Sequence, residues 1–129
     1  MYIYKAGVVG AGKMGTGIAQ VISYSGIPVA LKDVSQEMLQ NAMSYIKGTY
    51  ETRIKKGKMT QDEMDQKVQL VTPTDSYDSF SDADIIIEAV SENISLKKGI
   101  FTELDKATPP NCILASNTSS LSISEVAAS

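Results

Sequence analysis

Three glycines close to the N-terminus have the spacing that phosphate binding requires. They lie between an apolar run and a helical pattern, in the six residues Gly10-Ala11-Gly12-Lys13-Met14-Gly15. The first glycine permits a tight turn, the second leaves no Cβ between backbone and ligand, and the third lets the helix pack closely on the preceding strand. The N–H groups that begin this helix would face a phosphate, whose negative charge the helix dipole favours. The turn therefore predicts a diphosphate site.

Asp33 supplies the acid that such a site needs for a nucleotide sugar. It lies 18 residues beyond Gly15, at the end of the second predicted strand, where its carboxylate can accept hydrogen bonds from both ribose hydroxyls. A glycine pattern alone also fits a purely structural turn, but the order of strand, turn, helix, strand and acid favours a dinucleotide. Asp33 would repel a 2′-phosphate, and Val34 supplies no arginine to compensate. We therefore expect NAD rather than NADP.

A second group of polar residues follows the fourth and fifth predicted strands. Because ligands of an open parallel sheet lie at the carboxyl ends of its strands, these residues are candidates for the nicotinamide end of the site. Each also has a structural interpretation: the segment ASNTSSLSI can cap its own helix, Glu92 suits a helix N-terminus, and Lys97 suits a solvated face. The candidates after the fourth strand are Ala89, Val90, Ser91, Glu92 and Lys97, and those after the fifth are Asn117 and Ser119.

The elements that position these residues alternate between strand and helix. We expect strands that end near residues 9, 31, 71, 87 and 115, the third of them terminated by Pro73. Between the second and third strands, apolar spacing predicts a long helix from Ser35 to about Lys56, and the capping box at residues 60–63 predicts a shorter one. The chain should form one α/β domain over residues 1–129, a Rossmann-type doubly wound, mostly parallel sheet with an enlarged helical hairpin after the second strand.

Composition excludes several classes of function. A formal net charge of −3 argues against a general nucleic-acid binder, although residues 47–58 hold five cations and one anion. The single Cys112 and the absence of histidine argue against a disulfide and against a metal site. Because no apolar run approaches the roughly 18 residues of a transmembrane helix, we expect a cytoplasmic protein without a membrane partner.

Taken together, these segments resemble the NAD-binding domain of the L-3-hydroxyacyl-CoA dehydrogenase family, which includes 3-hydroxybutyryl-CoA dehydrogenases. The resemblance rests on Asp33 and on the segments GVVGAGKMGTGIAQV, KKGKMT, EAVSENISLKKGIFTELD and ILASNTSSLSI. It implies that the turn, including Met14, lines the diphosphate of NAD and that Asp33 holds the adenosine ribose. The residues that it implies for the nicotinamide half are Val90, Ser91, Glu92 and Lys97.

The resemblance also implies a substrate and a reaction. Ser119 would lie near both the nicotinamide and the substrate hydroxyl, with Asn117 beside it, and Lys56, or less certainly Lys55, would face the phosphates of coenzyme A. A solvated helix end is the alternative for these lysines. In the family, a hydride passes from C3 of a 3-hydroxyacyl-CoA to NAD while a histidine accepts the hydroxyl proton.

This chain has no histidine. We therefore expect it to be the front part of a longer enzyme, whose histidine segment and C-terminal helical dimerisation domain lie elsewhere, and to bind NAD without turnover. The parent would be a homodimer. A 3-hydroxyisobutyrate or 6-phosphogluconate dehydrogenase domain is disfavoured by the enlarged crossover and by the SNTSSL segment, whereas a non-catalytic dinucleotide-binding module stays open.

Overall fold

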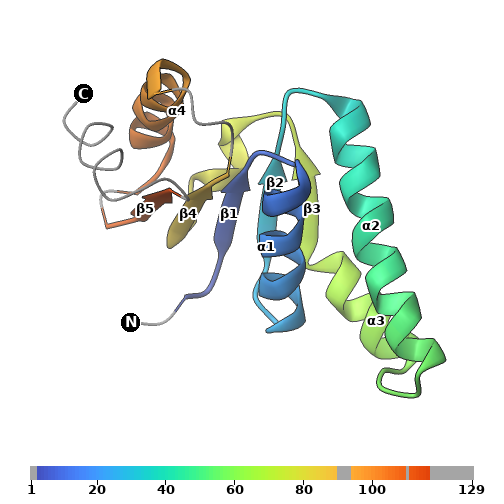
Figure 1. Ribbon diagram of the computed structural model, residues 1–129. Helices are drawn as coiled ribbons and strands as arrows, with labels where there is room; N and C mark the ends of the chain where they lie inside the picture. The colour runs from blue at the N-terminus through green and yellow to red at the C-terminus, as the bar shows by residue number, and fades with distance from the viewer. Residues whose placement is uncertain (1–2, 90–93, 110, 117–129) are drawn as a thin grey trace.

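Five parallel strands form a single sheet at the centre of the protein. The computed structural model describes residues 3–89, 94–109 and 111–116. The strand order is β3-β2-β1-β4-β5 (Figure 1). From β1 in the middle, the chain builds the sheet to one edge through β2 and β3 and then to the other edge through β4 and β5. The strands are β1 (Ala6–Val9), β2 (Val29–Lys32), β3 (Val71–Thr74), β4 (Ile85–Glu88) and β5 (Ile113–Ser116).

Helices cover both faces of this sheet. The α2–α3 hairpin extends past the β3 edge (Figure 1). One apolar cluster joins alternate residues of β1 and β2, such as Val8 and Leu31, to the helices α1–α3 on one face. A second cluster joins the intervening residues, such as Val9 and Ala30, to α4 and the short 3₁₀ helix η1 on the other face. The helices are α1 (Lys13–Tyr24), α2 (Gln36–Lys55), α3 (Gln61–Gln69) and α4 (Ile94–Ala107), with a short 3₁₀ helix, η1 (Tyr77–Phe80). This arrangement confirms the doubly wound fold with its enlarged hairpin.

Caps fix where the two hairpin helices begin. The Ser35 side chain accepts a hydrogen bond from the Met38 N–H at the start of α2. At the start of α3, Thr60 and Glu63 form both hydrogen bonds of the predicted capping box. Each cap satisfies backbone donors that would otherwise lack partners, so the hairpin begins and turns at defined residues.

Pro73 does not terminate the third strand, and that prediction is wrong. It lies within β3 and pairs in register with Leu31. Val29 N–H donates to Leu70 O and Asp33 N–H donates to Thr74 O. Alternate residues of β3 therefore point their backbone polar groups toward β2, and the backbone nitrogen of Pro73 points away from β2. Since β3 is an edge strand, the missing N–H of the proline costs no hydrogen bond in the sheet.

In the part of the chain that the structure describes, no helix is long and apolar enough to cross a membrane.

Candidate functional site

The glycine turn joins β1 to α1 at the carboxyl edge of the sheet. Gly10 has a φ of 106°, which side chains disfavour, and its N–H donates to Lys32 O at 2.8 Å. A Cβ on Gly15 would lie 1.7 Å from Gly10 O, so only glycine lets α1 approach the turn this closely. Two of the three glycines therefore have the structural roles that their spacing predicts.

Gly12 is the glycine that leaves room for a ligand. It is the N-cap of α1, with an ordinary extended backbone, a φ of −75° and a ψ of −167°. A Cβ placed there would meet only Met38 Cε, at 3.9 Å. Gly12 offers no side chain to cap the helix, and the first turn of α1 contains no acid. The start of α1 thus suits an anion that approaches the backbone closely.

Asp33 faces the glycine turn from the end of β2. Its Oδ2 accepts the Ala11 N–H and its Oδ1 accepts the Ser35 N–H, each at 2.9 Å. Each carboxylate oxygen has two lone pairs, so both oxygens keep an acceptor position for a ribose hydroxyl. The structure therefore brings the ribose acid and the diphosphate turn together, and the residues present fit a bound dinucleotide.

A depression of about 340 Å³ lies beside the glycine turn, between α1 and α2. Its walls are mainly apolar, and Tyr45 contributes the largest exposed ring, 60% accessible. Lys13, a predicted cofactor residue, also lines it. The full lining is Ala11, Gly12, Lys13, Thr16, Met38, Asn41, Ala42 and Tyr45.

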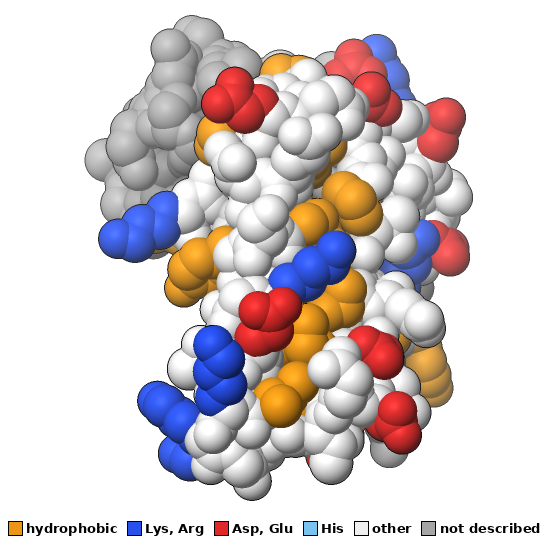
Figure 2. Space-filling view, turned by 90° about the vertical axis from the view of Figure 1, so that its right-hand side faces the viewer, with side chains coloured by type: hydrophobic (Ala, Val, Ile, Leu, Met, Phe, Trp, Pro, Cys, Tyr) orange, Lys and Arg blue, Asp and Glu red, His pale blue; other side chains and the backbone are white. Residues whose placement is uncertain are grey.

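A second depression, of about 360 Å³, lies at the far end of α2 and contains Lys56. It is basic: Arg53 and Lys58 line it together with Thr49 and Thr52. Figure 2 shows Lys and Arg side chains gathered at the lower left, at the hairpin end of the molecule.

Lys56 lines this depression, whereas its neighbour Lys55 does not. The sequence already placed Arg53 and Lys58 in the same group of cations as Lys56, without giving either a role of its own. It gave no signal for Thr49 and Thr52, which also line the depression. Arg53 also packs over the Tyr24 ring, 4.5 Å from its centroid, which holds one cation of the group against α1.

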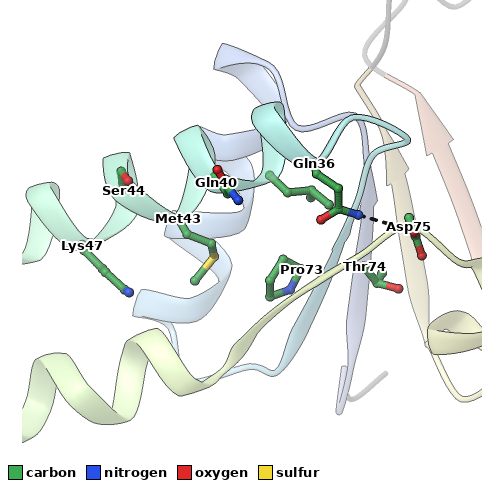
Figure 3. A pocket seen from close by; sticks show the side chains of 9 residues that line it. Gln36, Gln40, Met43, Ser44, Lys47, Pro73, Thr74 and Asp75 are labelled. Carbon is green, nitrogen blue, oxygen red and sulfur yellow. Dashed lines mark hydrogen bonds between the residues drawn. The ribbon is translucent and has the colours of Figure 1, made fainter.

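A third depression, of about 500 Å³, opens on the other flank of α2, facing β3 (Figure 3). Met43 and Pro73 approach each other at its floor, and Lys47 lies at its hairpin end. At the opposite end Gln36 Nε2 donates to Asp75 Oδ2 at 3.4 Å. No residue predicted for the cofactor or the substrate lines this groove.

The predicted nicotinamide end is described only in part. Ala89 follows β4, and its N–H donates to Val9 O at 2.8 Å, which places it beside the end of β1. Lys97 lies in the first turns of α4, but its side chain is outside the described structure. The remaining candidates, Val90, Ser91, Glu92, Asn117 and Ser119, lie outside the described residues.

Comparison with known proteins gives a consistent result. The family model for the NAD-binding domain of 3-hydroxyacyl-CoA dehydrogenase matches residues 5–129. The chain is 41% identical over 124 residues to the peroxisomal fatty acid beta-oxidation multifunctional protein MFP2 of Arabidopsis thaliana. The matched segment covers 96% of this chain and 17% of that protein. The chain is 40% identical over 127 residues to a 3-hydroxybutyryl-CoA dehydrogenase of Mycobacterium tuberculosis, covering 98% of this chain and 44% of the relative.

A solved structure of a 3-hydroxybutyryl-CoA dehydrogenase from Escherichia coli K12 superposes on the chain with a TM-score of 0.94 and 35% identity. The superposition covers 99% of this chain and 27% of that one. The chain thus spans less than half the length of each of these relatives.

Proposed function

Because the chain belongs to the NAD-binding domain of the 3-hydroxyacyl-CoA dehydrogenase family, we propose that it is the cofactor-binding part of an enzyme that oxidises the 3-hydroxyl group of an acyl-CoA. The observation that carries the proposal is the meeting of Asp33 with the glycine turn, where Gly12 leaves space and Gly15 allows close packing. The relatives supply the substrate class, since they are named for fatty acid beta-oxidation and for 3-hydroxybutyryl-CoA.

Bound NAD would supply the hydride acceptor. The residues of this chain bind and orient it: backbone N–H groups at the start of α1 hold the diphosphate, and Asp33 accepts the ribose hydroxyls. Ala89 would contact the nicotinamide half from the end of β4, and Lys97 would contact it from α4. The same half is where we place Val90, Ser91 and Glu92, together with Asn117 and Ser119 near the substrate hydroxyl.

The basic depression at the hairpin end of α2 is the proposed site for the coenzyme A phosphates. Lys56 lines it with two further cations, Arg53 and Lys58, and no acidic residue lines it. Coenzyme A carries a diphosphate and a 3′-phosphate, so a concentration of cations at one end of a long helix suits its nucleotide end.

The reaction needs a group that accepts the hydroxyl proton, and this chain has no histidine to serve as that group. We therefore propose that the chain alone binds NAD and coenzyme A but forms no NADH from a 3-hydroxyacyl-CoA. The homodimeric state of the parent enzyme and its cytoplasmic location belong to the same proposal and rest on the resemblance to the family.

Isothermal titration calorimetry with NAD and with coenzyme A tests this proposal. We expect both to bind, and we expect Lys56→Met to weaken coenzyme A without changing NAD affinity. Lys55→Met is the matched control, because it removes the same charge from the neighbouring position outside the depression. Equal losses for both lysine variants would contradict the assignment of the phosphates to this depression. NADH formation by the chain alone would contradict the proposed lack of turnover.

A further inference from the structure

Ala11, in the glycine turn, is held by hydrogen bonds on both sides of its backbone. Its N–H donates to Asp33 Oδ2 at 2.9 Å, and its carbonyl oxygen accepts the hydroxyl proton of Thr16 at 3.1 Å. Thr16 is only 3% exposed, so its bond is shielded from water. The Asp33 bond belongs to the ribose site already described. The Thr16 bond is a second, separate constraint on the turn.

The Thr16 hydroxyl does not bond where the hydroxyls of helical threonines usually do. Inside a helix, a threonine hydroxyl commonly bonds the carbonyl three or four residues back. Thr49 in α2 and Thr108 just after α4 follow this rule, each donating to the carbonyl four residues back. The Thr16 N–H donates to Gly12 O in the helical pattern, but its hydroxyl reaches past Gly12 to Ala11 O. The hydroxyl of Thr16 thus acts on the turn rather than on its own helix.

The same bond sets the direction of the Gly12 N–H. The Ala11 carbonyl and the Gly12 N–H belong to one planar trans peptide group, in which C=O and N–H point in opposite directions. Because the oxygen points into α1 toward Thr16, the Gly12 N–H points away from the body of the helix. No residue in the described part of the chain accepts this N–H. It is therefore aimed outward, where a ligand can reach it.

The two preceding N–H groups of the turn are already engaged. Gly10 N–H donates to Lys32 O at 2.8 Å, and Ala11 N–H donates to Asp33. The Gly12 N–H is thus the first backbone donor along the turn that a ligand can use, and it belongs to the glycine that leaves room for one. An anion binds more tightly to a donor that already points at it, because binding then has less to order.

The peptide group between Ala11 and Gly12 has a freedom that the Thr16 bond removes. Rotation of this group changes ψ of Ala11 and φ of Gly12, and glycine accepts a wider range of φ than any other residue. Without the hydroxyl, orientations that turn the Gly12 N–H away from the ligand become accessible. If the binding orientation fell to about one molecule in five, the apparent NAD affinity would fall about fivefold.

We propose that Thr16 is a positioning residue for the cofactor: its hydroxyl holds the Ala11 carbonyl and thereby aims the Gly12 N–H at the diphosphate. Thr16 acts through the backbone and not through contact with NAD. Asp33 holds the same residue from the other side, so the turn has its binding shape before the cofactor arrives. This inference rests on the proposed function, which places the diphosphate at the start of α1, and it adds the side chain that prepares that place.

Three variants of Thr16 test the role of the hydroxyl by NAD calorimetry. Thr16→Val keeps the branched shape and removes the hydroxyl, and we expect NAD affinity to fall roughly three- to tenfold. Thr16→Ala places a strong helix former in α1, so it stays folded even where valine disturbs the packing, and it should weaken NAD similarly. Thr16→Ser keeps the hydroxyl and should bind NAD within about twofold of the wild type.

Thr108→Val is the matched control. It removes a comparable bond, from a threonine hydroxyl to a backbone carbonyl at 2.7 Å. Thr108 comes after α4 and before β5, which places it at the amino edge of the sheet, whereas the cofactor turn lies at the carboxyl edge. We expect this variant to bind NAD as the wild type does.

Ligands with and without a diphosphate separate a positioning role from a general structural one. ADP-ribose carries the diphosphate and adenosine does not, but both carry the ribose that Asp33 would hold. We expect Thr16→Val to weaken ADP-ribose by the same factor as NAD and to leave adenosine binding, followed by NMR titration, unchanged. A general loosening of the site would weaken all three ligands.

The possible results distinguish this inference from the proposed function. The role of Thr16 is wrong if the valine and alanine variants bind NAD with wild-type affinity, if the serine variant binds it as weakly as the valine variant, or if adenosine is weakened as much as NAD. Each of these results leaves the proposed function standing. If the wild-type chain binds neither NAD nor ADP-ribose, the diphosphate site is wrong, and the proposed function fails with it.

Discussion

Replacing single glycines of the turn by alanine should separate ligand binding from folding. Gly12 has a backbone conformation that alanine adopts, and the added Cβ would meet only the tip of Met38 at 3.9 Å. We expect Gly12→Ala to change the free energy of unfolding by less than about 1 kcal/mol, because a poorer N-cap is offset by a less flexible unfolded chain. The same methyl group would occupy the space of the diphosphate. NAD affinity should fall at least about tenfold, or about 1.4 kcal/mol.

Gly15→Ala should act on the fold itself. Its Cβ would lie 1.7 Å from Gly10 O and 2.9 Å from Gly10 C, which are backbone atoms that cannot rotate away. Overpacking of this kind costs about 1–3 kcal/mol even where side chains can move, so we expect at least that loss of unfolding free energy. Gly17→Ala is the control: its Cβ would meet nothing within 4 Å, and the alanine should stabilise α1 by up to about 1 kcal/mol.

Urea denaturation and NAD calorimetry on the three variants provide the measurements. The reasoning is refuted if Gly12→Ala binds NAD as tightly as Gly17→Ala, or if Gly15→Ala is as stable as the wild type.

Three further predictions follow from polar groups. Asp33→Asn places an amide nitrogen against one of the two backbone N–H donors, those of Ala11 and Ser35. Calorimetry should show NAD binding weakened at least roughly tenfold and a smaller preference for NAD over NADP. An unchanged preference would contradict the role of the Asp33 charge. Tyr50→Phe removes the hydrogen bonds of the Tyr50 hydroxyl to Ser23 and Gln20, while Ser23 Oγ still donates to Gln20 O at 2.9 Å. We therefore expect a loss of about 0.5–1.5 kcal/mol in urea denaturation, and a loss within error would show that these bonds contribute nothing. Burial, and secondarily Glu103, raise the pKa of Tyr77 above 10.0. The stabilising contribution of Tyr77 is therefore present below pH 10.0 and is lost as the pH rises through the folded pKa. Above that pH, melting temperatures should fall less steeply for Tyr77→Phe than for the wild type, and parallel curves would contradict this.

Local chemistry made most elements predictable from the sequence. The capping box at Thr60 and the N-cap at Ser35 specify helix starts through hydrogen bonds between near neighbours, and the structure contains both. Pro73 was misjudged because its effect depends on which way its N–H would face and on whether the strand lies at an edge, and neither is a local property. The helix η1 was not predicted either. Its Phe80 is buried against Gly7, a contact between residues far apart in the chain.

The candidate site shows the same division. The residue types at Gly12 and Asp33 carry their chemistry wherever a strand, a turn and a helix come in order, so the sequence predicted them as a pair. It did not predict that Asp33 already holds the Ala11 N–H and so fixes the turn before a cofactor binds. Lys56 was preferred to Lys55 only through the resemblance to the family. Adjacent positions of a helix point about 100° apart, and only the packing of α2 decides which of them faces the depression.

Asp33 also relates the two proposed ligand sites to each other. Its second oxygen accepts the N–H of Ser35, and the Ser35 hydroxyl in turn accepts the N–H of Met38 and begins α2. The acid that would hold the ribose and the helix that would carry the acyl-CoA therefore start from one hydrogen-bonded corner. Because Tyr50 then holds the C-terminal half of α2 to α1, the helix cannot turn about its axis without breaking a buried contact. The distance between the cofactor turn and the basic depression at Lys56 is thus a property of the folded domain, present before either ligand binds.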